Sequence, residues 1–259
     1  MMKLQGRRTA PWSVVQWSTV AFSLMVAVQV PAQPPQGAPQ APRTGKAQAP
    51  VDLTGQWVSV VTEDWRYRMV TPAKGDYASV PLSADGRKAA DTWDPAKDEA
   101  AGNQCKSYGA PAIMRVPGRV RIAWADDDTM KVELDAGTQT RNFNFKPSSA
   151  AGGDWQGVSQ SSWDIIGGGR GGPVRGGSLK VITTKFKAGY LRKNGVPYSD
   201  KAVLTEYYDR TIEPNGDSWL VVTTIVDDPA NLNQPFITST HFKKQNDQSG
   251  WNPTACAAR

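Results

Sequence analysis

The chain has 259 residues, 39% hydrophobic content and a formal net charge of +6. This length allows one or two domains, and the hydrophobic content is enough to build a core. Five of the 30 Lys and Arg residues, and none of the 24 acidic residues, lie in residues 1–51, which leaves 25 basic against 24 acidic side chains in residues 52–259. That balance excludes the basic footprint of a nucleic-acid-binding protein.

Residues 1–32 have the pattern of a secretory signal peptide. A basic opening, MMKLQGRR, precedes a mostly apolar run at residues 13–30, and a small-residue cleavage site ends at Ala32. Polar residues interrupt the run, so it falls short of the roughly 20 apolar residues that a transmembrane helix needs. We therefore expect a periplasmic or secreted protein with no stable membrane insertion after signal cleavage.

Residues 33–51 are rich in Pro, Gln and Ala and predict a disordered linker, so we expect the folded domain to span residues 52–259. This domain contains two cysteines, Cys105 and Cys256. An oxidising compartment favours a disulfide between them, with two free thiols as the alternative. Two cysteines and a single histidine argue against a zinc site, and no cofactor is predicted.

Residues 56–62 and 64–70 alternate aromatic or β-branched residues with polar ones, which predicts a long, bent first strand. Between residues 71 and 104 the pattern changes to loops and short helices. Ser83 is a candidate cap for one helix, and Asp94, followed by Pro, is a candidate cap for the next. We expect these helices to cover one end of a sheet or barrel.

Alternation of hydrophobic and polar residues returns after Cys105. We predict further strands near residues 120–124, 130–134, 139–145, 154–164, 179–188, 203–212, 219–226 and 236–243. Short turns link most of these segments. The pattern predicts an all-β fold, a single antiparallel β-barrel of about 8–10 strands with short covering helices.

The segment Gly167–Gly177, GGGRGGPVRGG, lies between two of these strands. Arg-Gly tracts can bind RNA, but one short tract between strands favours a mobile loop. No βαβ unit surrounds the glycines, so they do not form a dinucleotide-binding fingerprint.

The start of the domain, Asp52–Trp57 with the sequence DLTGQW, resembles the G-x-W opening of lipocalin-like (calycin) barrels. The resemblance implies that a basic side chain of the last strand, Lys243 or Lys244, lies over Trp57. A longer part of the chain resembles a family of uncharacterised exported bacterial proteins, which share DLTGxW, W-x-G-x-S (Trp155, Gly157, Ser159), NGxPxS (Asn194, Gly195, Pro197, Ser199) and DDP (Asp227, Asp228, Pro229). This second resemblance implies a secreted β-barrel and no established activity.

Three residues on predicted strands are candidates for chemistry inside the barrel. Arg141 shares a strand face with Phe143, and an inward guanidinium needs a partner. Glu206 alternates with Tyr208, so both can point inward. A carboxylate beside a phenol can be a general base with a raised pKa, whereas a Glu206 paired with Arg141 is structural or clamps a ligand. We favour the pair.

His241 is the only histidine and lies on the last predicted strand. A lone histidine on a strand is usually a surface or hydrogen-bonded structural residue, and a catalytic role is the alternative.

The segment Gly189–Arg210 concentrates aromatic and ionisable residues around the turn NGVP. The turn itself needs only Asn, Gly and Pro. The additional aromatic and basic residues, among them Tyr190, Arg192 and Tyr198, are typical of a wall that holds a small apolar or aromatic ligand.

These patterns are compatible with three functions. The third, beside the two described next, is an envelope interaction module whose barrel is filled by side chains. The first is a binding protein for a small, partly apolar or aromatic molecule, its cavity lined by Trp57, Trp155, Trp163, Tyr208 and Arg141 with the wall at Tyr190, Arg192 and Tyr198. The alternative is a cofactor-independent lyase, isomerase or hydrolase in which Glu206 or His241 is the acid/base and Arg141 and Tyr208 stabilise an anion.

Overall fold

The computed structural model describes residues 43–259, apart from the side chain of Arg170. The predicted signal peptide and the first part of the predicted linker lie outside the described residues. The strands are β1 (Gly55–Val60), β2 (Arg119–Trp124), β3 (Thr129–Leu134), β4 (Gln139–Asn144), β5 (Val158–Gly167), β6 (Val174–Thr184), β7 (Gly189–Arg192), β8 (Val196–Tyr198), β9 (Val203–Ile212), β10 (Ser218–Asp227) and β11 (Phe236–Gln245). The short helices are α1 (Trp65–Arg68), α2 (Ala84–Ala90), α3 (Pro95–Ala100) and α4 (Ala110–Ile113), with 3-10 turns η1 (Gln104–Tyr108), η2 (Ala136–Thr138) and η3 (Gly169–Gly171).

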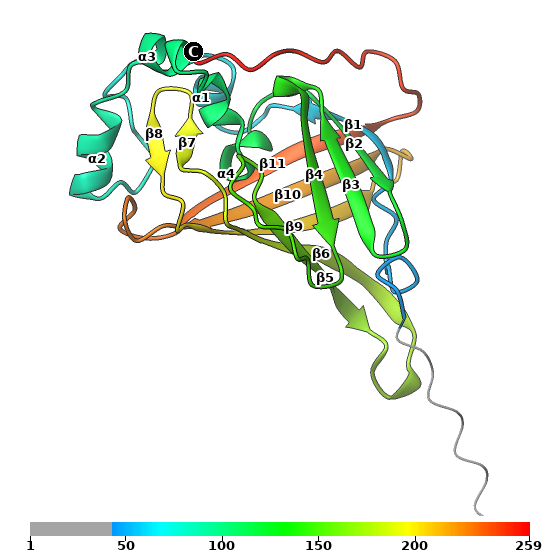
Figure 1. Ribbon diagram of the computed structural model, residues 1–259. Coiled ribbons are helices and arrows are strands. Elements are labelled where there is room, and N and C mark those ends of the chain that lie inside the picture. Colours follow the sequence, from blue (N-terminus) through cyan, green and yellow to red (C-terminus); the bar gives the residue numbers. More distant parts are fainter. Residues whose placement is uncertain (1–42) are drawn as a thin grey trace, which may run out of the picture. The chain divides into compact units, whose positions relative to one another are not determined.

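Nine strands form a closed barrel in the order β1-β11-β10-β9-β6-β5-β4-β3-β2, and β7 pairs with β8 in a separate two-stranded sheet (Figure 1). The all-β prediction and the strand number are confirmed. The purely antiparallel prediction is wrong, because β4 and β5 run parallel through the pairs Phe143↔Ser159 and Asn144↔Gln160. The chain leaves β4 through residues 145–157 before it starts β5, so it returns in the same direction.

The barrel core follows the alternation of the strands. On β3, Met130, Val132 and Leu134 are buried while their neighbours are half-exposed. Trp57 on β1 is also fully buried, and the ammonium of Lys244 lies 5.5 Å from the centre of its ring. This contact agrees with the one expected from the G-x-W opening, although a lipocalin assignment needs more than this contact.

The predicted long first strand is wrong in its second half, because β1 ends at Val60 and residues 65–68 form the helical turn α1. Asp64 adopts a left-handed conformation with φ of 48°, which breaks the extended chain before the turn. As a result, Arg68 is buried while Trp65 is exposed. The alternating pattern of residues 64–70 therefore does not reflect a strand.

The remaining helices and the β7-β8 hairpin form a cap with its own hydrophobic core. Ser83 and Asp94 cap α2 and α3 as predicted, each side chain accepting backbone N–H bonds. The cap core includes Leu204 and Phe236 at the ends of barrel strands β9 and β11. The expectation that short helices cover one end of the barrel is therefore confirmed.

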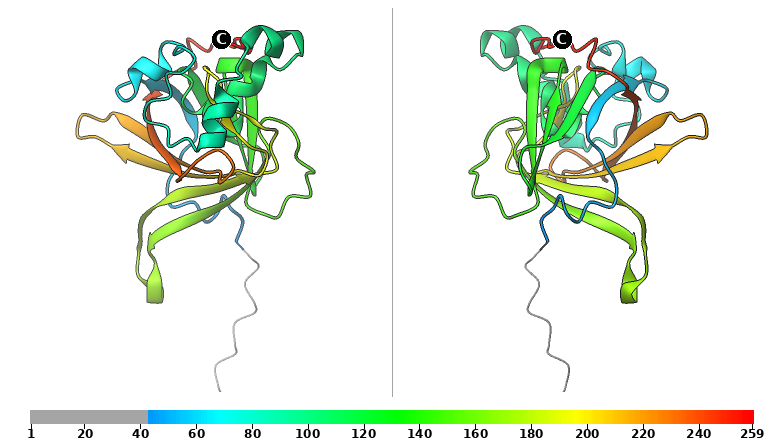
Figure 2. Two further views of the ribbon diagram at one scale, coloured as in Figure 1. Left: turned by 90° about the vertical axis from the view of Figure 1, so that its left-hand side faces the viewer. Right: turned by 90° about the vertical axis from the view of Figure 1, so that its right-hand side faces the viewer.

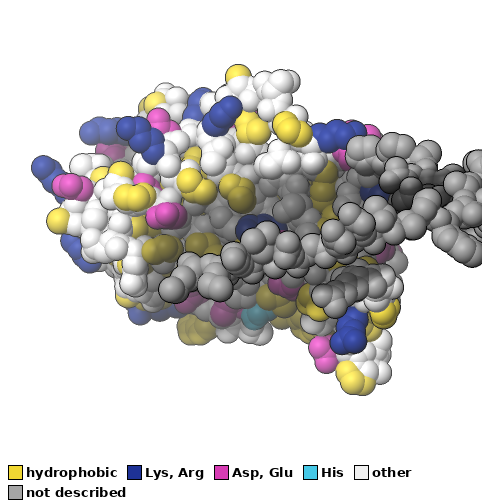
Figure 3. All heavy atoms as spheres, turned by 90° about the horizontal axis from the view of Figure 1, so that it is seen from below, with side chains coloured by type: hydrophobic (Ala, Val, Ile, Leu, Met, Phe, Trp, Pro, Cys, Tyr) yellow, Lys and Arg dark blue, Asp and Glu magenta, His cyan; other side chains and the backbone are white. Residues whose placement is uncertain are grey.

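The glycine-rich segment forms the tip of the β5-β6 hairpin, which projects beyond the barrel in both views of Figure 2. Ile165, Ile166 and Val174 are exposed on it. Side chains of both charge signs occur on the face seen in Figure 3, in separate small groups. That mixture agrees with the balanced charge of residues 52–259.

Residues 43–51, expected to be the end of the linker, contact the barrel. The N–H groups of Gly45 and Lys46 donate to the Asp128 carboxylate and the Asp127 carbonyl, and the Trp163 indole N–H donates to the Gly45 carbonyl at 2.7 Å. The contacts with the barrel therefore begin before Asp52.

Cys105 and Cys256 form a disulfide with a Cα–Cα distance of 5.1 Å, as predicted. The bond joins η1 of the cap to the C-terminal segment across 151 residues of sequence. Among residues 43–259, no helix has both the length and the apolar composition to cross a membrane.

Candidate functional site

The structure brings Arg141, Glu206 and Tyr208 together inside the barrel, as the strand pattern predicts. Two guanidinium nitrogens of Arg141 donate to the two carboxylate oxygens of Glu206 at 2.9 and 2.5 Å. The Tyr208 hydroxyl donates to the same carboxylate at 3.0 Å. Arg141 also donates to the hydroxyl of Thr183, which contacts that of Ser159. All five side chains are buried.

We call Arg141, Glu206, Tyr208, Thr183 and Ser159 the barrel cluster. It contains a buried ion pair in which the charges of Arg141 and Glu206 balance each other. Burial by itself lowers the pKa of Arg141, but attraction to Glu206 and Tyr208 outweighs it and raises the pKa above its usual value. Burial, with Glu206 nearby, raises the pKa of Tyr208 well above its usual value, so Tyr208 is a neutral donor at neutral pH. The pair therefore fits a structural role, and participation of these residues in catalysis or ligand binding stays a prediction.

The three tryptophans expected to line the cavity lie in different places. Trp57 packs within the barrel core, its indole N–H donating to the Leu53 carbonyl. Trp163 is half-buried and stacks on Phe145 at 5.5 Å. Trp155 lies in the loop before β5, where Lys187 covers its ring. They do not form one wall.

His241 lies on β11 between Thr240 and Phe242, both of which are buried, so its ring is on the opposite, outer face. Its Nδ1 lies 3.1 Å from Glu63. Glu206, in contrast, is fully buried inside the barrel. The structure thus separates the two candidate acid/base residues, because His241 lines an outer pocket with Glu213 and Asp217 whereas Glu206 lies in the barrel interior.

Tyr190 and Tyr198 belong to the cap. The Tyr190 hydroxyl donates to Asp98 at 2.7 Å, and Lys106 lies over its ring. Tyr198 is buried edge-on against Phe186. Both tyrosines pack the cap rather than a cavity.

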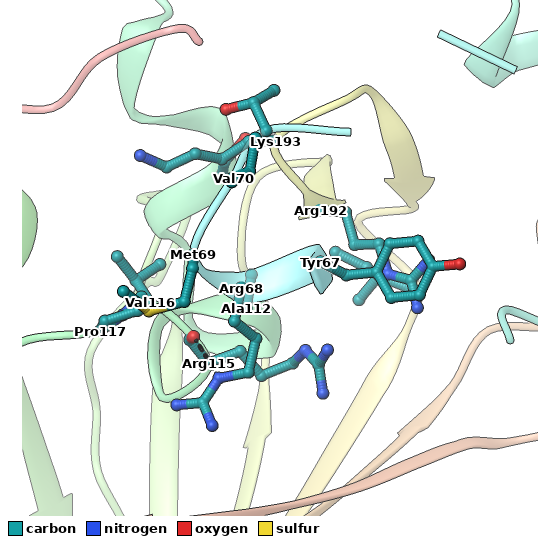
Figure 4. A pocket seen from close by; sticks show the side chains of 13 residues that line it. Tyr67, Arg68, Met69, Val70, Ala112, Arg115, Val116, Pro117, Arg192 and Lys193 are labelled. Atoms are coloured by element: carbon teal, nitrogen blue, oxygen red, sulfur yellow. Dashed lines mark hydrogen bonds between the residues drawn. The ribbon is translucent and has the colours of Figure 1, made fainter. Parts of the chain in front are cut away.

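Arg192, the third residue expected in this wall, lines a pocket of about 90 Å³ in the cap (Figure 4). The pocket lies between α1, the turn after α4 and the end of β7, and its lining residues are Tyr67, Arg68, Met69, Val70, Thr71, Ser107, Ala112, Arg115, Val116, Pro117, Leu191, Arg192 and Lys193. Four of them are basic and none is acidic. We call this the arginine pocket.

Two of the pocket arginines form ion pairs with carboxylates that do not line the pocket. Arg68 pairs with Glu63 and donates through Nε to the Arg115 carbonyl at 2.9 Å, a bond drawn as the dashed line in Figure 4. Arg115 pairs through Nη2 with Asp64 at 2.9 Å. Its Nη1 is buried without an acceptor among residues 43–259.

Arg192 differs from both. Only 4% exposed, it has no carboxylate partner among the described residues, and its one hydrogen bond goes from Nη1 to the Ala78 carbonyl at 2.6 Å. Its Nε and Nη2 are buried without an acceptor within residues 43–259. The guanidinium lies over the ring of Tyr67, 4.2 Å from its centre. A buried cation normally has an anionic partner, and Arg192 lacks a direct one among residues 43–259.

The pKa directions of the pocket arginines reflect burial first. Burial lowers the pKa of Arg192 and the charge of Arg115 lowers it further, while Asp64, Tyr67 and Asp76 act in the opposite direction. Burial likewise lowers the pKa of Arg68, against the opposing pull of Glu63. An anion in the pocket would relieve both the desolvation and the repulsion between like charges.

The remaining pocket residues suit a ligand that is only partly polar. Ala112 and Leu191 are buried apolar walls, and Met69 and Val70 are exposed at the opening. Within residues 43–259, no cluster of His, Cys, Asp and Glu has the arrangement of a metal site. In comparisons with known proteins, no family model, curated protein or solved structure matches the chain.

The sequence predicts a ligand-binding role for Arg192 but not for Arg68 or Arg115. Arg68 falls in the alternating stretch that predicted a strand, and Arg115 lies in a segment without strand or helix periodicity. A usable signal for Arg115 is the run Ile113–Val116, IMRV, in which one charged residue interrupts apolar ones. A charged residue in such a run is buried with it and needs a partner.

Proposed function

We propose that the protein is a periplasmic or secreted binding protein for a small organic anion with an apolar part, held in the arginine pocket. The observation that carries the proposal is Arg192, a buried guanidinium without a carboxylate partner among residues 43–259. Arg115 contributes a second unpaired donor beside it. The signal-peptide pattern and the Cys105–Cys256 disulfide support the compartment.

This proposal keeps the small, partly apolar ligand expected from the sequence, adds a negative charge to it, and moves its site from the barrel to the cap. The barrel cluster already satisfies its own charges, because Arg141 and Glu206 form a bidentate pair. The unpaired Nε and Nη2 of Arg192 lie on one edge of the guanidinium, and both atoms are buried. That edge matches the spacing of two oxygens of a carboxylate.

Calorimetric titration with propionate and benzoate tests the proposal, with propylammonium as a cationic control. We expect the wild-type protein to bind both carboxylates and not the cation. Arg192→Met removes the charge but keeps an apolar side chain, and should weaken binding by about 10- to 100-fold, since a charge-assisted bond contributes about 1.5–3 kcal/mol.

Arg175→Met is the matched control, because Arg175 is exposed on the β5-β6 hairpin and does not line the pocket. It should bind the carboxylates like the wild type. If the Arg192→Met protein binds both carboxylates with unchanged affinity, or if the wild type binds neither, the arginine pocket is not an anion site.

A further inference from the structure

The arginine pocket is small compared with the ligand that an isolated binding protein usually encloses. Its volume is about 90 Å³, whereas pockets that bury a whole small molecule have roughly 300–1,000 Å³. A pocket of this size accommodates an anionic head group and little more. If the proposed function holds, most of the ligand must therefore lie outside the pocket.

Apolar side chains from two segments line the pocket. Met69 and Val70 follow α1 and are 60% and 64% exposed, although both also line the pocket. Val116 and Pro117, which follow α4, line it as well and are half-buried. Single exposed hydrophobic residues are normal on protein surfaces. Here two pairs border the one opening of a cationic pocket, and we call these four residues the apolar rim.

Arg68, Arg115 and Arg192 line the pocket, and we call these three basic residues the cationic floor. The cationic floor and the apolar rim together specify the ligand more closely than either part alone. A compact anion such as phosphate would occupy the floor and leave the rim exposed to water. A neutral or cationic apolar molecule would leave Arg192 without a partner. A molecule that satisfies both has one anionic end and an unbranched or flat apolar body.

We propose that the ligand is a single-chain amphiphile with a terminal carboxylate. Its carboxylate binds Arg192 and Arg115 inside the pocket, and its apolar chain runs outward over the apolar rim. This inference rests on the proposed function and names the ligand class of the same site.

A homologous series of straight-chain carboxylates from butanoate to decanoate tests this inference, with affinities measured by calorimetry. Full burial of one methylene raises affinity roughly four-fold, so a chain lying on a half-open rim should gain about two-fold per methylene. The double substitution Met69→Ser/Val70→Ser should reduce this increment toward one, so that it weakens decanoate binding much more than butanoate binding. Arg192→Met should weaken every member of the series by the same factor.

Ile165→Ser/Ile166→Ser is the matched control, since it removes two exposed apolar side chains from the β5-β6 hairpin. It should leave the increment per methylene unchanged. Butanoate binding without any gain along the series would overturn the amphiphile and leave the anion site intact. Absence of binding along the whole series would overturn both, as would equal gains along a series of alkylammonium ions.

Discussion

Arg141 in the barrel and Arg192 in the cap are buried to nearly the same degree, at 1% and 4% exposure, yet their surroundings are opposite. Arg141 binds both oxygens of Glu206, whereas Arg192 donates to one backbone carbonyl and has the charges of Arg115, Asp64 and Asp76 around it without a direct ion pair. The pKa of Arg141 is raised, and that of Arg192 is lowered. Burial alone therefore does not distinguish the two arginines, but the presence or absence of a direct ion-pair partner does.

The two environments have different structural origins. Arg141 and Glu206 lie on barrel strands β4 and β9, whose alternation directs both side chains to the interior. Arg192 ends β7, a short strand whose pairing with β8 is irregular between Tyr190 and Arg192. The register of the barrel strands thus gives Arg141 a partner, whereas the packing of the cap gives Arg192 no ion-pair partner among residues 43–259.

The largest effect should come from breaking the barrel pair. Arg141→Met leaves the buried Glu206 carboxylate without its cation, and should lower the free energy of unfolding by about 3–5 kcal/mol. Urea unfolding followed by tryptophan fluorescence measures this change. With Arg175→Met as the exposed control, an equal and small effect for both variants would show that the pair does not stabilise the barrel.

A second effect tests how far the cap depends on the disulfide. Replacing both Cys105 and Cys256 with Ala should lower the free energy of unfolding by about 2–4 kcal/mol. It should also weaken carboxylate binding, because Ser107 of the attached η1 turn lines the arginine pocket. Thiol titration of the denatured, unreduced wild type should find no free thiol, and two reactive thiols would contradict the bond.

A smaller effect separates the two sites from each other. Tyr208→Phe removes one hydroxyl that donates to Glu206, and should lower the free energy of unfolding by about 1 kcal/mol. Carboxylate affinity should stay the same, because Tyr208 does not line the arginine pocket. Weakened binding in this variant would instead place the ligand in the barrel, as expected from the sequence.

The features that follow strand alternation were predictable from the sequence. Glu206 and Arg141 share the inward parity of their strands, so their pairing could be inferred without a structure. The parallel contact of β4 with β5 could not, because it depends on the path of residues 145–157, which have no regular pattern. The local hydrophobic pattern also failed after Val60, where β1 ends and the left-handed Asp64 precedes the helical turn α1.

The arginine pocket was the least predictable part of the molecule. Arg68, Arg115 and Arg192 come from three segments that are far apart in the sequence and lie in turns or strand ends. No periodicity relates them, so only the packing of the cap brings their charges together. The sequence indicates a binding role for Arg192 only through the aromatic residues near it. The structure alone shows that Arg192 has no direct ion-pair partner among residues 43–259.

The most direct test of the account compares the unfolding free energies of the wild type and Arg192→Met, each with and without octanoate at about 100 times its dissociation constant. Without carboxylate, Arg192→Met should be the more stable protein by about 1–2 kcal/mol, because a buried unpaired charge is removed and water can reach the Ala78 carbonyl. With octanoate at about 100 times the wild-type dissociation constant, the wild type should gain about 2.7 kcal/mol. Arg192→Met, which binds about 10- to 100-fold more weakly, should gain only about 0.4–1.4 kcal/mol, so its lead in stability should shrink by about 1.3–2.3 kcal/mol. An Arg192→Met protein that is less stable than the wild type in both conditions, with no response of either protein to octanoate, would show that Arg192 is structural and contradict the account.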